Sequence, residues 1–63
     1  MLEVYVERWT EPGGGTRFPW SVWLDGKQVQ HNGRHDDPAA AEAEAVAFCR
    51  QMIGREPDRV RRL

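Results

Sequence analysis

A single helix with clear start and stop signals is the strongest constraint on how this chain can fold. Asp37 is a favourable N-cap, Pro38 suits the first helical position, and residues 39–52 contain no helix breaker. Gly54 then supplies a C-terminal cap, and Pro57 prevents the helix from continuing. Since one helix cannot bury its apolar face alone, the rest of the chain must supply the layer against which it packs.

The apolar side chains of this helix gather on one side of it. At 100° per residue they fall within an arc of about 160°. The arc holds Ala41, Ala45, Val46, Phe48, Cys49, Met52 and Ile53. Cys49 is the only cysteine, so it cannot form an internal disulfide, and its place in the arc predicts a buried structural thiol.

Two segments ahead of the helix alternate in the way that β-strands do. Residues 2–10 and residues 17–24 each place apolar side chains at every second position. Residues 11–16 lie between them and contain three successive glycines, which are typical of a loop. The side chains expected to face the helix are Val4, Val6, Trp20 and Val22.

The pair Asp25-Gly26 predicts a tight turn that fixes the pairing of the strands on either side. A type I′ turn needs positive φ at both central positions, and Asp-Gly meets that need. Residues 27–32 are polar apart from Val29, which is typical of an edge strand. The expected pairs across the turn are Leu24 with Lys27, Trp23 with Gln28, Val22 with Val29 and Trp20 with His31.

These elements predict an α+β fold for a single small domain that spans residues 1–63. We expect a three- to four-stranded antiparallel sheet in the order β-β-β-α, with the helix packed on one face. Residues 59–63 are expected to form either a closing strand or an arginine-rich tail.

The length of the chain also limits its function. A domain of this size buries only about 60% of its unfolded surface, so a deep substrate cavity is not expected. No serine, histidine and carboxylate are spaced as a nucleophilic set, and Ser21 belongs to the outward face of its strand. We therefore predict that the protein is not an enzyme.

Apolar runs long enough to cross a membrane are absent from the sequence, since a span needs roughly 20 apolar residues. The segment after Met1 lacks the basic and apolar regions of a signal peptide. Together with the single cysteine, these features predict a soluble cytoplasmic protein with no membrane partner.

Two histidines and two carboxylates lie close together in residues 31–37. His31, His35 and Asp36 would be potential metal ligands if the loop folded inward, but the spacing fits no closed zinc site. The glycines of residues 13–15 lack the following lysine and helix of a phosphate-binding loop. We expect no metal and no other cofactor.

The net charge of −1 hides an uneven distribution. Residues 1–47 carry four basic and eight acidic side chains, whereas residues 48–63 carry five arginines and two acidic residues. If the two parts form separate surfaces, those surfaces should have opposite charge.

Three outward aromatic residues are the most informative candidates for a binding site. Tyr5 and Trp9 are expected on one face of the first strand, and Trp23 on the same side of the second, with no second layer to cover them. Exposed aromatic residues often anchor interfaces. The alternatives are a small cluster covered by the glycine loop or the C-terminal segment, and a homodimer interface.

Charged residues near these aromatics suggest two kinds of partner. Arg59, Arg61 and Arg62 could contact phosphates, and aromatic side chains could stack on the bases of a single strand. Glu3 and Glu7 would repel a phosphate backbone and would instead attract a basic protein surface.

The tryptophan strand Trp20-Ser21-Val22-Trp23, the Asp25-Gly26 turn, the alanine-rich helix and Val60 resemble short bacterial domains related to YegP. The same order is similar to small phage proteins that inhibit host machinery, such as an inhibitor of bacterial RNA polymerase and anti-CRISPR proteins. The N-terminal half of HicB-type antitoxins shares the strand–strand–strand–helix order. The resemblances to the YegP-related domains and to the phage proteins cover residues 17–63 in outline and carry no diagnostic motif. All these groups imply action by binding.

The sequence thus predicts a binding protein that occupies a partner's surface by shape and charge. The most specific form of the hypothesis is a phage-type inhibitor of a nucleic-acid-handling complex such as a CRISPR effector. The alternatives are a small nucleic-acid-binding module that uses the C-terminal arginines and a domain that dimerises through its sheet. The expected binding residues are Glu3, Tyr5, Glu7, Trp9, Trp23, Arg59, Arg61 and Arg62.

Overall fold

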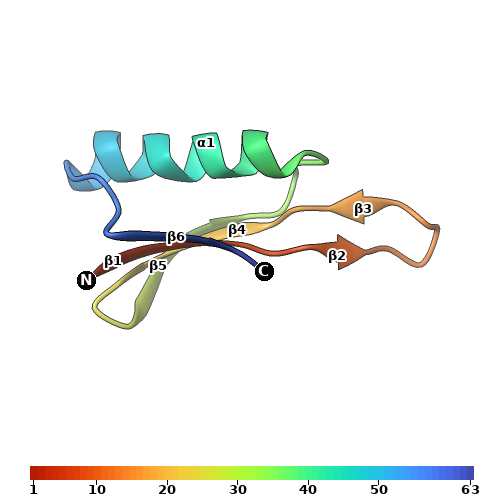
Figure 1. Ribbon diagram of the computed structural model, residues 1–63, viewed down its shortest axis with the longest axis horizontal. Coiled ribbons are helices and arrows are strands. Elements are labelled where there is room, and N and C mark those ends of the chain that lie inside the picture. Colours follow the sequence, from red (N-terminus) through yellow and green to blue (C-terminus); the bar gives the residue numbers. More distant parts are fainter.

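One helical segment lies across one face of a four-stranded sheet in the computed structural model, which describes residues 1–63 (Figure 1). The sheet has the strand order β5-β4-β1-β6, and a hairpin of two further strands, β2 and β3, extends beyond it (Figure 1). This confirms the predicted α+β fold with its helix on one face. The elements are β1 (Leu2–Val6), β2 (Trp9–Thr10), β3 (Thr16–Arg17), β4 (Trp20–Leu24), β5 (Lys27–Asn32), α1 (Pro38–Phe48), η1 (Cys49–Ile53) and β6 (Arg59–Arg62).

The closing segment is a strand rather than a tail, but it does not run antiparallel. Strands β1 and β4, and strands β4 and β5, pair antiparallel, whereas β6 pairs with β1 in parallel. The prediction of a wholly antiparallel sheet was therefore wrong for this strand. After β5, the helical segment crosses the sheet to the opposite edge and also returns the chain to the end of the sheet at which β5 begins (Figure 1). β6 therefore starts at that end and runs in the same direction as β5 and β1.

The helix begins as its capping signals predict. The Asp37 carboxylate accepts a hydrogen bond from the Ala40 backbone N–H at 3.0 Å, and Gly54 ends the segment with a φ of 82°. The last turn, η1, is π-helical, which changes the direction in which its side chains point. Ala41, Ala45 and Cys49 are buried as expected, but Met52 was wrongly assigned to the buried arc, since it is 72% exposed.

Strands β1 to β4 form one long hairpin with an interruption. The register that pairs Leu2 with Leu24 in the main sheet continues outward to pair Trp9 with Arg17 in the second sheet. The two predicted strands over residues 2–10 and 17–24 are therefore each divided. Pro19 explains the division, because it has no N–H to donate to the opposite strand and only its carbonyl bonds, to the Glu7 N–H at 2.8 Å.

The turn between β4 and β5 confirms the prediction from Asp25-Gly26, with φ angles of 51° and 84°. Trp23 pairs with Gln28 as expected, but a β-bulge follows on β5 and shifts the register by one residue. The predicted pairs of Val22 with Val29 and of Trp20 with His31 were therefore wrong. The observed pairs are Val22 with Gln30, Ser21 with His31 and Trp20 with Asn32.

The hydrophobic core lies between the helix and the sheet. Partly buried Phe48 packs on it, with its ring 6.1 Å from that of Trp20. β5 forms one edge of the sheet, as its polar sequence predicted. The buried apolar side chains are Leu2, Val4, Val6, Trp20, Val22, Ala41, Ala45 and Cys49.

None of the helical segments has the length and apolar character needed to cross a membrane.

Candidate functional site

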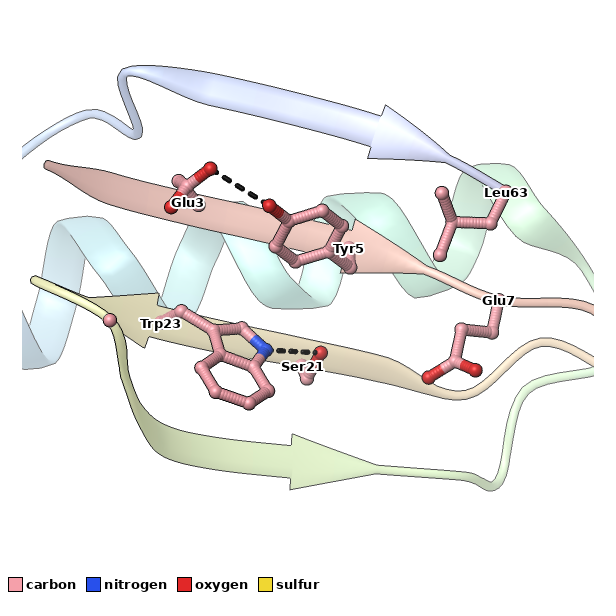
Figure 2. Close-up of a pocket in the computed structure, with 7 residues that line it drawn as sticks. Glu3, Tyr5, Glu7, Ser21, Trp23 and Leu63 are labelled. Atoms are coloured by element: carbon pink, nitrogen blue, oxygen red, sulfur yellow. Dashed lines mark hydrogen bonds between the residues drawn. The ribbon is translucent and has the colours of Figure 1, made fainter.

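The face of the sheet opposite the helix has no second layer over it (Figure 1). Because side chains alternate along a strand, the residues between the core positions of β1 and β4 all point to this side. They enclose a shallow groove of about 470 Å³, which we call the outer groove (Figure 2). It is lined by Glu3, Tyr5, Glu7, Ser21, Trp23, Gly26 and Leu63.

Each outward aromatic residue donates a hydrogen bond to the residue two positions earlier on its own face. The Tyr5 hydroxyl donates to Glu3 Oε2 at 2.8 Å, and the Trp23 indole N–H donates to Ser21 Oγ at 2.9 Å (Figure 2). The polar atoms of both rings are thus satisfied within the protein. What the two rings offer to a partner is their apolar surface and their π faces.

The Tyr5 hydroxyl is held in its protonated form. Its hydrogen bond to Glu3, followed by partial burial and the negative charge of that carboxylate, raises the pKa of Tyr5 above its ordinary value. Tyr5 therefore remains a neutral ring with an occupied donor at neutral pH. This state suits contact with a partner better than proton transfer.

Trp9 follows the same hydrogen-bonding pattern but lies outside the outer groove. Its indole N–H donates to Glu7 Oε1 at 3.2 Å, which places it on the same side as Glu7. Because β1 ends at Val6, Trp9 belongs to the projecting hairpin, where it is 57% exposed. The three aromatics thus share one side of the sheet as expected, but only Tyr5 and Trp23 line the groove, and Trp9 lies beyond it.

The hairpin of β2 and β3 projects away from the sheet, with the three glycines near its tip (Figure 1). It therefore leaves the outer groove uncovered. Of the C-terminal segment, only Leu63 lines the groove. The alternative in which the glycine loop or the C-terminal segment covers Tyr5 and Trp23 is therefore not the arrangement of this structure.

The C-terminal arginines do not form one basic surface. Register places Arg59 beside Glu3 and Arg61 beside Tyr5, on the outer face. Arg62 is on the helix side, where its Nε lies 2.9 Å from Glu42 Oε1. The condition for two oppositely charged surfaces is therefore not met, because the side chains of β6 alternate between both faces of the sheet and lie next to those of the acidic strand β1.

The two carboxylates of the outer groove differ in their surroundings. Glu3 accepts from the Tyr5 hydroxyl and lies 3.9 Å from the Arg59 guanidinium. Glu7 accepts only the Trp9 indole N–H and takes part in none of the ion pairs of the protein. Glu7 is therefore the uncompensated negative charge of the groove.

The histidines do not come together with carboxylates in a metal site. His31 is exposed on β5, whereas His35 contacts the carboxylate of Glu44, which also accepts from the Trp20 indole N–H at 2.9 Å. The bonds from His35 and Trp20 lower the pKa of Glu44. Asp36 is exposed and pairs with neither, and no group of three or more potential ligands is arranged to hold a metal ion.

Cys49 begins the last helical turn, η1, and is buried in the hydrophobic core, as the sequence predicted. Burial raises the pKa of its thiol, so the reactive thiolate is disfavoured. Three lining residues of the outer groove, Ser21, Gly26 and Leu63, were not among the predicted binding residues. The alternation that identified Trp23 also places Ser21 on its face, and the alternation of Arg59 and Arg61 continues to Leu63.

Comparison of the chain with protein-family models, curated proteins and solved structures gives no match. The resemblances to YegP-related domains, phage inhibitors and antitoxins therefore stay predictions.

Proposed function

We propose that this protein is a non-enzymatic binding protein that occupies a partner's surface with the outer face of its sheet. The observation that carries the proposal is the outer groove, where two large aromatic side chains lie without a covering layer. Aromatic residues in such positions supply much of the binding energy of interfaces. Their polar atoms are already bonded, so a partner gains apolar contact without having to satisfy them.

The charge of the groove favours a basic partner. Glu3 and Glu7 are the only charged residues that line it. Carboxylates beside an aromatic contact steer the approach of a positively charged surface and disfavour phosphates. The specific form that we propose is a phage-type inhibitor, which blocks a basic surface of a nucleic-acid-handling complex such as a CRISPR effector or bacterial RNA polymerase.

A nucleic-acid-binding module is the second candidate. One observation favours it: Arg59 and Arg61 lie on the outer face beside the residues of the groove. Phosphates could contact these arginines while a base stacked on Tyr5. We rank it second because Arg59 is close to Glu3 and because the groove itself is lined by carboxylates.

Inhibition assays test the first candidate. The protein is added to target-DNA cleavage by a purified CRISPR effector and to transcription by purified bacterial RNA polymerase. We expect inhibition of one of these reactions, lost in Trp23→Ala and retained in Met52→Ala, which removes an exposed apolar side chain from the helix side. Circular dichroism establishes that both variants are folded.

A gel-shift titration with a single-stranded oligonucleotide separates the second candidate from the first. Salt-sensitive binding that is lost in the Arg59→Ala/Arg61→Ala variant, without inhibition of either enzyme, would overturn the inhibitor proposal in favour of a nucleic-acid-binding module. Light scattering at several concentrations identifies the third outcome, a homodimer that buries the outer face.

A further inference from the structure

The outer groove combines an apolar body with one unpaired carboxylate. Tyr5, Trp23 and Leu63 provide the apolar surface, and Glu7 is among the residues that line the groove (Figure 2). The other carboxylate, Glu3, is already bonded to the Tyr5 hydroxyl and close to Arg59. Among the side chains that line the groove, a ligand would therefore meet a ring surface and one carboxylate outside any ion pair, that of Glu7, while Arg59 and Arg61 stay beside Glu3 and Tyr5 on β6.

The rings of Tyr5 and Trp23 can contact a cation with their π faces, but they have no free donor for a hydrogen-bond acceptor. Hydrogen bonds along the strands hold the Tyr5 hydroxyl and the Trp23 indole N–H, so neither is free to donate to a ligand. The π faces remain, and an aromatic π face attracts ammonium and guanidinium groups. Long basic side chains also lay their methylene groups on apolar surface while their charged end reaches a polar one.

We infer that the outer groove receives an arginine or lysine side chain from a basic segment of the partner, an inference that rests on the proposed function. The methylene groups of that side chain lie over Tyr5 and Trp23, and its charged end pairs with the Glu7 carboxylate. Charge complementarity selects this occupant, because a phosphate or an acidic peptide would meet the same carboxylate unfavourably. Arg61 is next to Tyr5 in register but is not among the residues that line the groove.

The test uses blocked tetra-arginine and tetra-lysine peptides as probes and nuclear magnetic resonance as the readout. The three tryptophan indole N–H signals report on different places. Trp23 lies in the groove, Trp9 bonds to Glu7, and Trp20 bonds to Glu44 beneath the helix. We expect both peptides to shift the Trp23 and Trp9 signals in a saturable way and to leave the Trp20 signal in place. Shifts with tetra-glutamate instead, or shifts confined to Trp20, would overturn the inference.

Two variants with the same change of charge locate the contact. Glu7→Gln removes the charge but keeps an oxygen that can accept from Trp9, whereas Asp36→Asn removes an exposed charge that makes no ion pair and lies outside the groove. We expect Glu7→Gln to weaken tetra-arginine binding roughly fivefold and Asp36→Asn to change it by less than about twofold. Equal effects of the two variants would show attraction by net charge alone and would overturn the inference.

The outcomes separate this inference from the proposed function. Inhibition of a nucleic-acid-handling enzyme without groove-specific peptide binding refutes the cation pocket and leaves the inhibitor proposal standing. Saturable peptide binding that depends on Glu7, without inhibition of either enzyme, supports the pocket and refutes the inhibitor proposal.

Discussion

β1 lies in the core of the fold and β6 lies at its surface, so the same substitution should lower the free energy of unfolding by very different amounts in these two neighbouring strands. Val4 and Val60 are register partners on the helix side of the sheet. Val4 is completely buried, whereas Val60 is 38% exposed. Replacing either with alanine removes the same two methyl groups, so the difference in stability reports how far each position belongs to the core.

The expected magnitudes follow from burial. Two buried methyl groups are worth roughly 1.6 kcal/mol in transfer free energy, and an unfilled cavity raises the cost of Val4→Ala to about 2 to 3 kcal/mol. Val60→Ala should cost less than about 1 kcal/mol, because much of that side chain already contacts water. A domain of 63 residues has a free energy of unfolding of roughly 3 to 9 kcal/mol, so the first substitution removes a large share of it.

Urea unfolding followed by tryptophan fluorescence measures both effects. With an m-value near 1 kcal/mol/M, the midpoint of Val4→Ala should fall by about 2 to 3 M and that of Val60→Ala by less than about 1 M. Equal losses for the two variants would refute the reasoning, because they would mean that β6 contributes to the core as fully as β1.

Three further predictions concern single contacts. Asp58 accepts a hydrogen bond from the buried Leu2 backbone N–H at 2.7 Å, and this bond lowers the pKa of its carboxyl. The bond should therefore contribute to the free energy of unfolding above the pH range in which an ordinary aspartate titrates, and this contribution should be lost as the pH falls through the lower pKa of the folded state. Asp58→Asn should flatten the acid side of the curve of unfolding free energy against pH. An unchanged curve would contradict this role of the Asp58 carboxylate. Gly54→Ala should lower the free energy of unfolding by roughly 1 kcal/mol, because Gly54 has a positive φ that alanine adopts unfavourably. Gly13 has no positive φ and no neighbouring atom near an added Cβ, so Gly13→Ala should change the free energy of unfolding by less than about 0.5 kcal/mol. The urea midpoints of the two variants test this difference. Cys49 should react with a disulfide reagent more than about tenfold faster in urea than in buffer, and equal rates would show that the thiol is not buried.

The helix could be predicted in detail because its signals are local. The Asp37 cap, the following proline and the glycine at residue 54 each act within one turn of the chain. The π-helical last turn could not be predicted, since nothing in residues 49–53 marks it, and Met52 was misplaced for that reason.

The sequence predicted which segments form the strands of the sheet better than it predicted how residues pair between them. The Asp25-Gly26 turn set the first two pairs correctly, but the bulge at Val29 depends on how β5 fits beside β4 and has no glycine to announce it. The parallel pairing of β6 with β1 is set by the path of the helix across the sheet. That path is a property of the whole fold rather than of residues 59–62.

The candidate site was partly visible in the sequence. Alternation placed Tyr5 and Trp23 on one side of the sheet and Glu3 and Glu7 with them, and the structure brings these four into the outer groove. The arginines were harder to place, because a run of basic residues gives no sign of which face each one occupies until its strand partner is known. Only the register with β1 showed that Arg59 lies close to Glu3.

The place of β6 at the edge of the sheet also bears on how the chain avoids self-association. β1 is rich in apolar residues and precedes β6 in the chain, so its free edge stays open until residues 59–62 are synthesised and pair with it. An open edge of this kind is a template for pairing with another nascent chain. When β6 docks, it replaces that edge with one that bears Arg59, Arg61 and Arg62, and charged side chains on an edge strand disfavour its pairing with the edge of a second sheet. β6 thus completes the sheet and replaces an apolar edge with a charged one.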